Sequence, residues 1–507
     1  MKRDNLRRLA LLLCMSLPLT ACGANSSGSG KIPGGTELTG EPSASTDEVA
    51  YSNRLLEEYC AIDTVVRNED GEFPVSIHIP QLKSDAEQAV ALNRQLAAAW
   101  SGFLTADGKV NENAVTGDLS IMWESRWNDS LVSLLITERL MDEQTTSVFH
   151  YDFYEEQQYG GAQLLRRLNI SDEAFIAAVC RAAAREFDAT GYTEESTDAR
   201  YLLRAQTLAN AADTVHEPTF YPDSESALTV FVPFAVPTGA GYCEKALHAA
   251  LSGPITPLHA DADGTAADLS ADGTVSVMFS GESSGKYAEQ YGFACGKAYP
   301  VSGCFGSYTK LFVGSVGPDY NPYLFLLTDS GTVEFIRLFG GAYFGKFVCG
   351  GPLYGVTGIA DFEAVQSTVY AVSANGARHD LADAVSRAEN AFPQALSGTW
   401  SGTQYGENGD VTEYTLDIQP NGRMVECAFY ENVPDGNIHA AYTGLLGLVG
   451  MDETGLVCGY TLTGPDGNDL AGAVSLLPQS DTLLVQPVGG DALFDAPDGL
   501  EFLRSVG

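Results

Sequence analysis

Basic residues are scarce in this chain: among 507 residues, 28 Lys and Arg stand against 66 Asp and Glu, and the net charge is -38. Such a chain would repel a phosphate backbone unless it carried a basic patch, and no basic run follows Arg8. Beyond the first residues, no stretch approaches about 18 uninterrupted apolar residues. We therefore expect neither a nucleic-acid partner nor a membrane-spanning helix.

Sequence motifs for metal ions and for redox chemistry are also missing. The sequence contains no Cys-x-x-Cys pair, no Cys beside His at zinc spacing, and no His-x-His or His-Glu-x-x-His motif. We therefore expect no metal and no cofactor. For the eight cysteines that follow Cys14 and Cys22, two interpretations stay open. They are buried free thiols, or they form one or two disulfides, with Cys295 to Cys304 and Cys427 to Cys458 as the candidate pairs.

The composition that is present indicates a folded protein. Apolar residues make up 45% of the chain and charged residues 19%, which excludes a disordered or fibrous class. At about 150 residues per domain, the length predicts about three folded units.

The first residues have the pattern of a targeting signal. A basic segment ending at Arg8 is followed by the apolar run 9–19 and then by Leu19-Thr-Ala-Cys22. This arrangement resembles a bacterial lipoprotein signal peptide. The resemblance implies that residues 1–21 are removed and that the thiol of Cys22 is diacylated, which would anchor the protein at the extracytoplasmic side of a membrane. The Gly- and Ser-rich residues 22–48 then predict a lipid anchor followed by a flexible tether.

Residues 49–252 mix strand and helix patterns. The alternation in 73–79 predicts a strand that Pro80 ends, and Ser84 with Glu87 forms a capping-box pattern at the start of a helix. A second helix is expected after Ser171, with a buried stripe of Phe175, Val179, Ala183 and Phe187. We therefore predict an N-terminal α+β domain at 49–252.

Four motifs occur in order within this region. They are Ile79-Pro-Gln-Leu82 leading to Leu92-Asn93, Trp127-Asn128 before Leu131, Tyr151-Asp-Phe153, and the segment 228–241. Together they resemble the extracellular domain of RsiV-like proteins, which occurs in lysozyme-sensing anti-sigma factors and in some peptidoglycan deacetylases. The chain departs from that family at 142–147, where the family has Gly-Gly-Ala-His. Because cleavage before Cys22 would leave no cytoplasmic segment, an anti-sigma role is not expected.

Two β-rich units are expected to follow, at 253–392 and 393–507, so that the predicted fold class is α+β with a barrel or sandwich in each of the last two domains. Hairpins are predicted at Asp329-Ser-Gly331 and at Ala374-Asn-Gly376. Gly398-x-Trp400 on the first strand of the last unit and Arg504 on its last strand resemble lipocalin-like barrels, in which the arginine packs over the tryptophan.

One motif suggests catalysis, but its surroundings do not. Gly281-Glu-Ser283-Ser-Gly285 matches the nucleophile elbow of α/β-hydrolases, yet the following 100 residues predict hairpins instead of alternating strands and helices. We interpret it as a Gly-Ser loop. The fragments 261–264 and 465–469 look like parts of calcium loops, and turn formation explains them better because neither has the closing Glu.

The function that these features favour is non-catalytic binding by a lipid-anchored cell-surface protein. The expected ligand is a wall component such as peptidoglycan, or a basic secreted protein such as a muramidase. The alternative is an extracellular hydrolase of cell-wall or other polymers, with a site assembled from scattered residues such as Ser283 and Asp152. We expect binding, because no acid–base arrangement is visible in the sequence.

Overall fold

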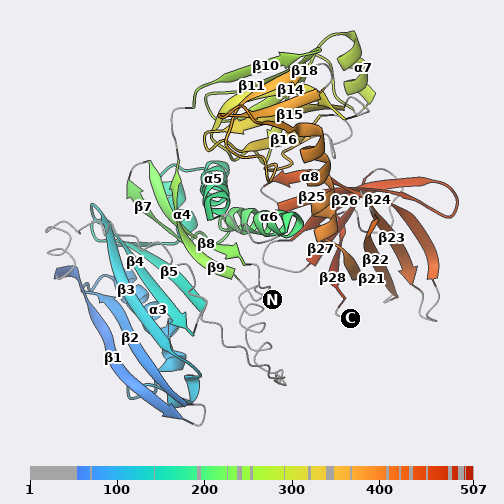
Figure 1. Cartoon of the computed structure of the whole chain (residues 1–507). Helices are drawn as coiled ribbons and strands as arrows, with labels where there is room; N and C mark the ends of the chain where they lie inside the picture. The colour runs from blue at the N-terminus through green and yellow to red at the C-terminus, as the bar shows by residue number, and fades with distance from the viewer. Residues whose placement is uncertain are drawn as a thin grey trace. The chain divides into compact units, whose positions relative to one another are not determined.

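The computed structural model describes the greater part of the chain after residue 53, in several stretches (Figure 1). The described residues are 54–68, 71–141, 143–190, 196–224, 226–236, 242–251, 255–290, 292–317, 321–338, 347–365, 368–406, 410–421, 424–432, 438–452, 455–477, 482–488, 496 and 498–505. The predicted lipid-attachment residue Cys22 and the predicted tether at 22–48 lie outside these residues.

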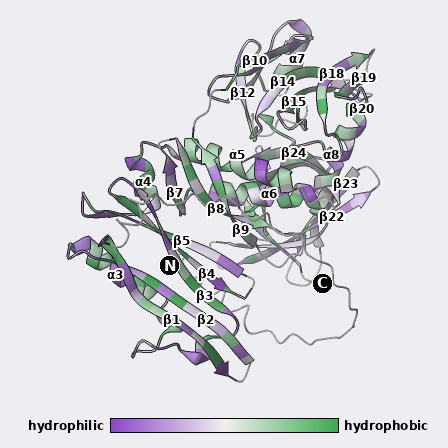
Figure 2. Cartoon of the chain, turned by 60° about the vertical axis from the view of Figure 1, so that its left-hand side comes forward, coloured by the Kyte–Doolittle hydropathy of each residue, from purple (hydrophilic) through white to green (hydrophobic). Residues whose placement is uncertain are grey.

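The first sheet has six strands in chain order, with one helix against it. The elements are β1 (Leu56–Asn68), β2 (Gly71–Leu82), α3 (Glu87–Ala99), β3 (Leu119–Asn128), β4 (Leu131–Leu140), β5 (Glu143–Asp152) and β6 (Gln157–Tyr159). Neighbours pair antiparallel except β2 and β3, which are parallel and are connected through α3. Figure 2 shows hydrophobic and hydrophilic residues interspersed along β2, in which buried residues alternate with more exposed ones from Val75 to Ile79. Val75, Ile77 and Ile79 of β2 therefore face one core, which Leu92 and Leu96 of α3 complete.

Three helices and a three-stranded antiparallel sheet come next. They are α4 (Gly161–Arg167), α5 (Asp172–Thr190), α6 (Thr197–Asp213), β7 (Phe220–Ser224), β8 (Ala227–Ala235) and β9 (Tyr242–Ala250). Ser171 caps α5, since its hydroxyl accepts a hydrogen bond from the Ala174 N–H at 3.2 Å. The expected stripe of α5, including Phe175 and Phe187, packs with β8 in a second core.

The middle of the chain is built from short sheets. One has the order β10 (Leu258–Ala262), β11 (Thr265–Leu269), β12 (Val275–Phe279), β13 (Ala298–Ser302), β17 (Phe347–Val348). The second contains β14 (Tyr308–Val316), β15 (Asn321–Thr328) and β16 (Val333–Arg337), and the third β18 (Ile359–Val365), β19 (Thr368–Ser373) and β20 (Arg378–Asp380). Helix α7 (Glu282–Gln290) follows β12, and α8 (Leu381–Ala395) follows β20. The two hairpins predicted from Asp329-Ser-Gly331 and Ala374-Asn-Gly376 are both present.

The last eight strands form a closed antiparallel barrel. They are β21 (Gly398–Tyr405), β22 (Val411–Asn421), β23 (Met424–Asn432), β24 (Ile438–Asp452), β25 (Gly455–Thr463), β26 (Asp469–Leu476), β27 (Thr482–Val488) and β28 (Leu500–Arg504). The inward residues, among them Trp400, Phe429 and Phe502, fill the barrel. The same core continues into Tyr201 of α6 and Leu381 of α8. A β-barrel, one of the two architectures expected here, is therefore confirmed.

The barrel closes where its first strand meets its last. Trp400 pairs with Arg504, and the guanidinium carbon of Arg504 lies 4.3 Å from the centre of the indole ring. Arg504 also donates a hydrogen bond to the Ser397 carbonyl at 3.2 Å. This is the contact that the Gly-x-Trp and Arg pattern led us to expect.

Replacing Arg504 by alanine is expected to lower the free energy of unfolding by about 1–2 kcal/mol, because the cation–π contact and the hydrogen bond at the barrel seam are both lost. Urea denaturation followed by tryptophan fluorescence measures the change. Leu503→Ala is the matched control, since that neighbouring side chain is 63% exposed. Equal midpoints for the two variants would contradict a role of Arg504 in closing the barrel.

The predicted α+β fold class is wrong. Among the described residues 54% lie in strands and 22% in helices, so the chain is mostly β, and the expected N-terminal α+β domain at 49–252 is not found as such. The main reason is that the sequence pattern indicates fewer strands than the structure contains. Residues 56–68 form the 13-residue strand β1, although their polar positions hide the period-two pattern.

Two local expectations near the first helix also differ from the structure. Strand β2 continues through Pro80 to Leu82, because an antiparallel neighbour on one side holds it in register. Helix α3 begins at Glu87, after an Ala86 cap without a side-chain hydrogen bond. The Ser84 hydroxyl instead accepts from the Ala86 N–H at 3.2 Å, so the predicted capping box does not form.

The structure bears differently on the two domain borders predicted near residues 253 and 393. Residues 252–254 lie outside the described residues, and 392–393 lies within α8. Residues 52–507 cluster as one compact unit. Within the described residues, no helix is long and apolar enough to cross a membrane.

Candidate functional site

A cleft of about 540 Å³ lies between helix α5 and the segments around β11, β12 and β14. Its wall on the helix side carries two arginines, and the opposite wall carries small, apolar and hydroxyl-bearing residues. The lining residues are Arg181, Arg185, Ala250, Leu251, Ile255, Thr256, Leu269, Ala271, Asp272, Gly273, Cys304, Gly306, Ser307 and Tyr308.

The periodicity of α5 places both arginines on the cleft. Val179, Ala183 and Phe187 bury one face of the helix, and Arg181 and Arg185 follow one another at a spacing of four on another face. Arg185 donates a hydrogen bond to the Ser307 hydroxyl at 3.3 Å. Within the described part of the chain, neither arginine forms a salt bridge, although acidic residues far outnumber basic ones.

The one carboxylate of the cleft is already engaged. Asp272 accepts hydrogen bonds from the Ser270 hydroxyl and from the Thr274 N–H, the latter at 3.0 Å. These bonds, first the one from Ser270, lower the pKa of Asp272. Asp272 thus stabilises the turn between β11 and β12 and remains ionised there, so the cleft carries one carboxylate against two guanidinium groups.

Beneath the cleft lies a buried polar network. The Tyr308 hydroxyl accepts from the Gly306 N–H at 3.0 Å and donates to the Glu334 carboxylate. Arg204 of α6 donates to Glu334 at 3.2 Å and to Asp188 of α5 at 3.2 Å. Arg204 and Glu334 are almost completely buried. The network therefore connects both long helices to β16 by charge-assisted hydrogen bonds.

Burial acts in opposite directions on the two charges. Burial raises the pKa of Glu334, although Arg204 partly opposes this. For Arg204, burial disfavours the charged form, but the carboxylates of Asp188 and Glu334 outweigh it and raise the pKa of Arg204. Such groups remain inside a protein only when they are paired, so the network fixes the helices relative to the sheet under the cleft.

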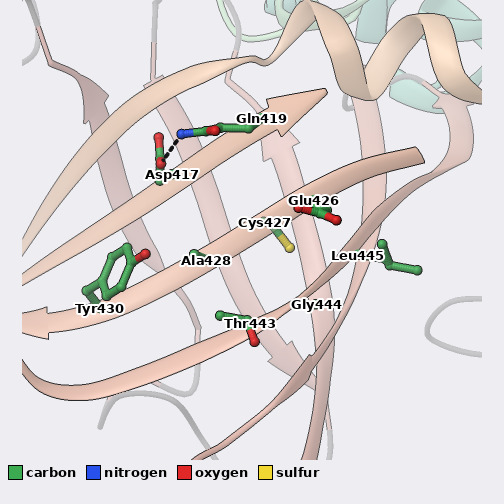
Figure 3. Close-up of a pocket in the computed structure, with 9 residues that line it drawn as sticks. All are labelled: Asp417, Gln419, Glu426, Cys427, Ala428, Tyr430, Thr443, Gly444 and Leu445. Carbon is green, nitrogen blue, oxygen red and sulfur yellow. Dashed lines mark hydrogen bonds between the residues drawn. The ribbon is translucent and has the colours of Figure 1, made fainter. Parts of the chain in front are cut away.

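A second hollow, of about 490 Å³, lies on the outer wall of the barrel over β22, β23 and β24 (Figure 3). Gln419 donates to Asp417 at 2.6 Å, and Asn421 donates to Glu426 at 2.6 Å. The alternate residues of these strands face the barrel core, so Asp417 and Glu426 point outward. Since this hollow carries two carboxylates and neither Lys nor Arg, it suits an anion poorly.

The residues proposed for a hydrolase lie on separate elements. The Gly-x-Ser-x-Gly segment connects β12 to α7, but the positive φ of this connection is at Gly281 and Ser283 already lies in the first turn of the helix, so Ser283 does not occupy the turn position of a nucleophile elbow. Asp152 is buried at the end of β5, where it accepts from the Tyr154 N–H at 2.8 Å and binds Arg167 at 2.7 Å. Burial opposes ionisation of Asp152, but these hydrogen bonds together lower its pKa. Asp152 therefore stabilises the turn after β5.

The calcium-like fragments form turns as expected. Asp263 and Gly264, both with positive φ, make the turn between β10 and β11, and Asp466 accepts from the Asn468 N–H at 3.1 Å. Among the residues that the structure describes, no group of three or more His, Cys, Asp or Glu side chains is placed to hold a metal ion.

Sequence reasoning missed the cleft. The spacing of Arg181 and Arg185 on a correctly predicted helix was a usable signal, because residues four apart on a helix lie on the same face. For Arg204 and Glu334, which are separated by 130 positions, the sequence carries no comparable signal.

Comparison with known proteins yields little. No family model matches the chain, and no curated protein matches it. Among solved structures, a de novo designed fluorescence-activating β-barrel is similar to 22% of this chain over 93% of its own length, with 19% identity and a TM-score of 0.15.

Proposed function

We propose that this chain is a non-catalytic binding protein of the cell surface, and that the cleft beside α5 holds a compact anionic group of a wall component. The observation that carries the proposal is the pair Arg181 and Arg185, which line a cleft and form no salt bridge with another described residue. Guanidinium groups bind carboxylates and phosphates through paired N–H donors.

The rest of the lining narrows the ligand class. The hydroxyls of Ser307 and Thr256 supply polar partners, and Leu251, Ile255 and Leu269 supply apolar contact. A carboxylate beside short aliphatic groups fits this combination, as in the peptide stems of peptidoglycan. The net charge of -38 opposes a long polyanion, so a single carboxylate is favoured over a phosphate polymer.

The proposed location at the cell surface rests on the lipoprotein signal and the tether. A diacylated Cys22 and the tether at 22–48 would hold the folded part close to the wall on the outer side of a membrane. The resemblance to RsiV-like domains points to ligands of the cell wall and to muramidases, and the contact between Trp400 and Arg504 supports a lipocalin-like origin for the barrel.

The double variant Arg181→Ala, Arg185→Ala is expected to bind soluble muropeptides about 10- to 100-fold more weakly than the unaltered protein, because two charge-assisted contacts are removed. Isothermal titration with disaccharide muropeptides measures the affinity. The same disaccharide without its peptide stem should bind neither protein.

The matched control removes two arginines elsewhere. Arg94 and Arg166 are exposed and lie outside the cleft, so Arg94→Ala, Arg166→Ala changes the net charge equally. This control should keep the affinity of the unaltered protein. Equal weakening by both double variants would show that net charge alone acts, and an unaffected cleft variant would place the ligand elsewhere.

A further inference from the structure

Two cysteines meet at the floor of the cleft. Strands β13 and β17 pair in parallel, with Val301 beside Phe347 and Ser302 beside Val348. The N–H of Cys349 continues this pairing by donating to the Ser302 carbonyl at 2.9 Å. Cys304 follows β13 by two residues and packs against the buried cluster that contains Cys349, and the two thiols interact there.

The two thiols differ in their access to solvent. Cys304 is half-buried and lines the cleft, whereas Cys349 is completely buried behind it. The sulfur of Cys349 also lies 3.8 Å from Glu334, to which it donates a weak hydrogen bond. The hydrogen bond with Cys304 and burial both raise the pKa of Cys349, so this thiol stays protonated at neutral pH.

Among the described cysteines, Cys304 is the one that lines the cleft. Cys243 is exposed on β9, and Cys295 is exposed and lies against Gly285 of α7. Cys427 and Cys458 lie on β23 and β25, which are separated in the barrel by β24. All eight described cysteines are free thiols in the structure, so neither candidate pair from the sequence is bonded.

We propose that Cys304 and Cys349 form a disulfide by thiol–disulfide exchange at the floor of the cleft. This modification site does not depend on the identity of the cleft's ligand. The oxidant is a small disulfide, which is reduced to two thiols while the two cysteine thiols are oxidised to one disulfide.

The positions of the groups assign a role to each. Cys304, as its thiolate, attacks one sulfur of the small disulfide and forms a mixed disulfide, and the first small thiolate leaves and takes up the proton lost by Cys304. Cys349 then gives its proton to the Glu334 carboxylate and attacks the sulfur of Cys304. The second small thiolate leaves and takes up that proton. Arg181 and Arg185 line the same cleft, and their positive charges attract an anionic reagent to it.

The experiment uses glutathione disulfide as the oxidant and the full chain as the protein. After incubation, free thiols are alkylated, and intact mass and peptide mapping are recorded. Peptide mapping of the unaltered protein is expected to yield one cross-linked peptide that joins Cys304 to Cys349 and is two hydrogens lighter than its two separate peptides. A cross-link between any other pair, or a stable glutathione adduct on Cys304 without closure, overturns the proposal.

Single variants separate the two roles. Cys349→Ser is expected to retain one glutathione on Cys304, because the second thiol is missing, and Cys304→Ser is expected to give no cross-link and no adduct on Cys349. Cys427→Ser is the matched control, since it removes a buried thiol in the barrel. This variant should form the cross-link between Cys304 and Cys349 as the unaltered protein does. Modification of Cys349 in the Cys304→Ser variant overturns the assignment of Cys304 as the attacking thiol.

Discussion

Replacing Arg204 by methionine is expected to lower the free energy of unfolding by about 3–5 kcal/mol. The substitution keeps much of the side-chain volume but leaves Glu334, which is completely enclosed, without its cation. The loss is therefore mainly the energy of a buried carboxylate without a counter-charge. Urea denaturation of the unaltered and variant proteins measures it.

A second substitution tests that explanation. When Glu334 is also replaced by leucine, most of the lost stability should return, because apolar residues of similar volume commonly replace a buried ion pair without penalty. Arg94→Met is the control for loss of an exposed arginine and should change stability by less than about 0.5 kcal/mol. A loss below about 1 kcal/mol for Arg204→Met would show that the network does not hold the helices to the sheet.

Lowering the pH from about 7 to about 4 is expected to destabilise the protein by about 3 kcal/mol through His150 alone. This side chain is buried on β5, where its Nδ1 and the Ser133 hydroxyl share a hydrogen bond of 2.9 Å, and burial lowers its pKa from 6.5 to about 4. In the unfolded chain the imidazole accepts a proton near pH 6.5. The stability is thus complete above pH 6.5 and is lost as the pH falls from 6.5 to 4.

The contribution of His150 is isolated by comparing variants across this pH range. His150→Gln keeps a hydrogen-bonding group but does not titrate, so its stability should fall less between pH 7 and pH 4 than that of the unaltered protein. His216→Gln is the matched control, because the His216 side chain is 72% exposed, and it should keep the full pH dependence. Trp123 and Trp127 lie in the same sheet as His150, so tryptophan fluorescence reports on its unfolding. Identical pH profiles for His150→Gln and the unaltered protein would disprove this account.

Local patterns in the sequence determined the elements that depend on neighbouring residues. Ser171 and the stripe from Phe175 to Phe187 predicted α5 because a helix repeats every 3.6 residues and its first N–H groups need a cap. The two hairpins followed from Asp329-Ser-Gly331 and Ala374-Asn-Gly376, since these residues adopt the turn conformations that a hairpin needs. The pair of Trp400 and Arg504 predicted the barrel seam, although only as a resemblance.

Only the tertiary structure showed that strands outnumber helices in this fold and where the cleft lies. Strand β1 carries too many polar residues to show a buried face, so it becomes visible only through its pairing with β2, and this is why the α+β class was wrong. Arg204 meets Glu334, and Cys304 meets Cys349, because separate strands and helices are brought together by packing. Contacts between residues so distant in the chain leave no periodic trace in the sequence, because periodicity records only which face of one element is buried.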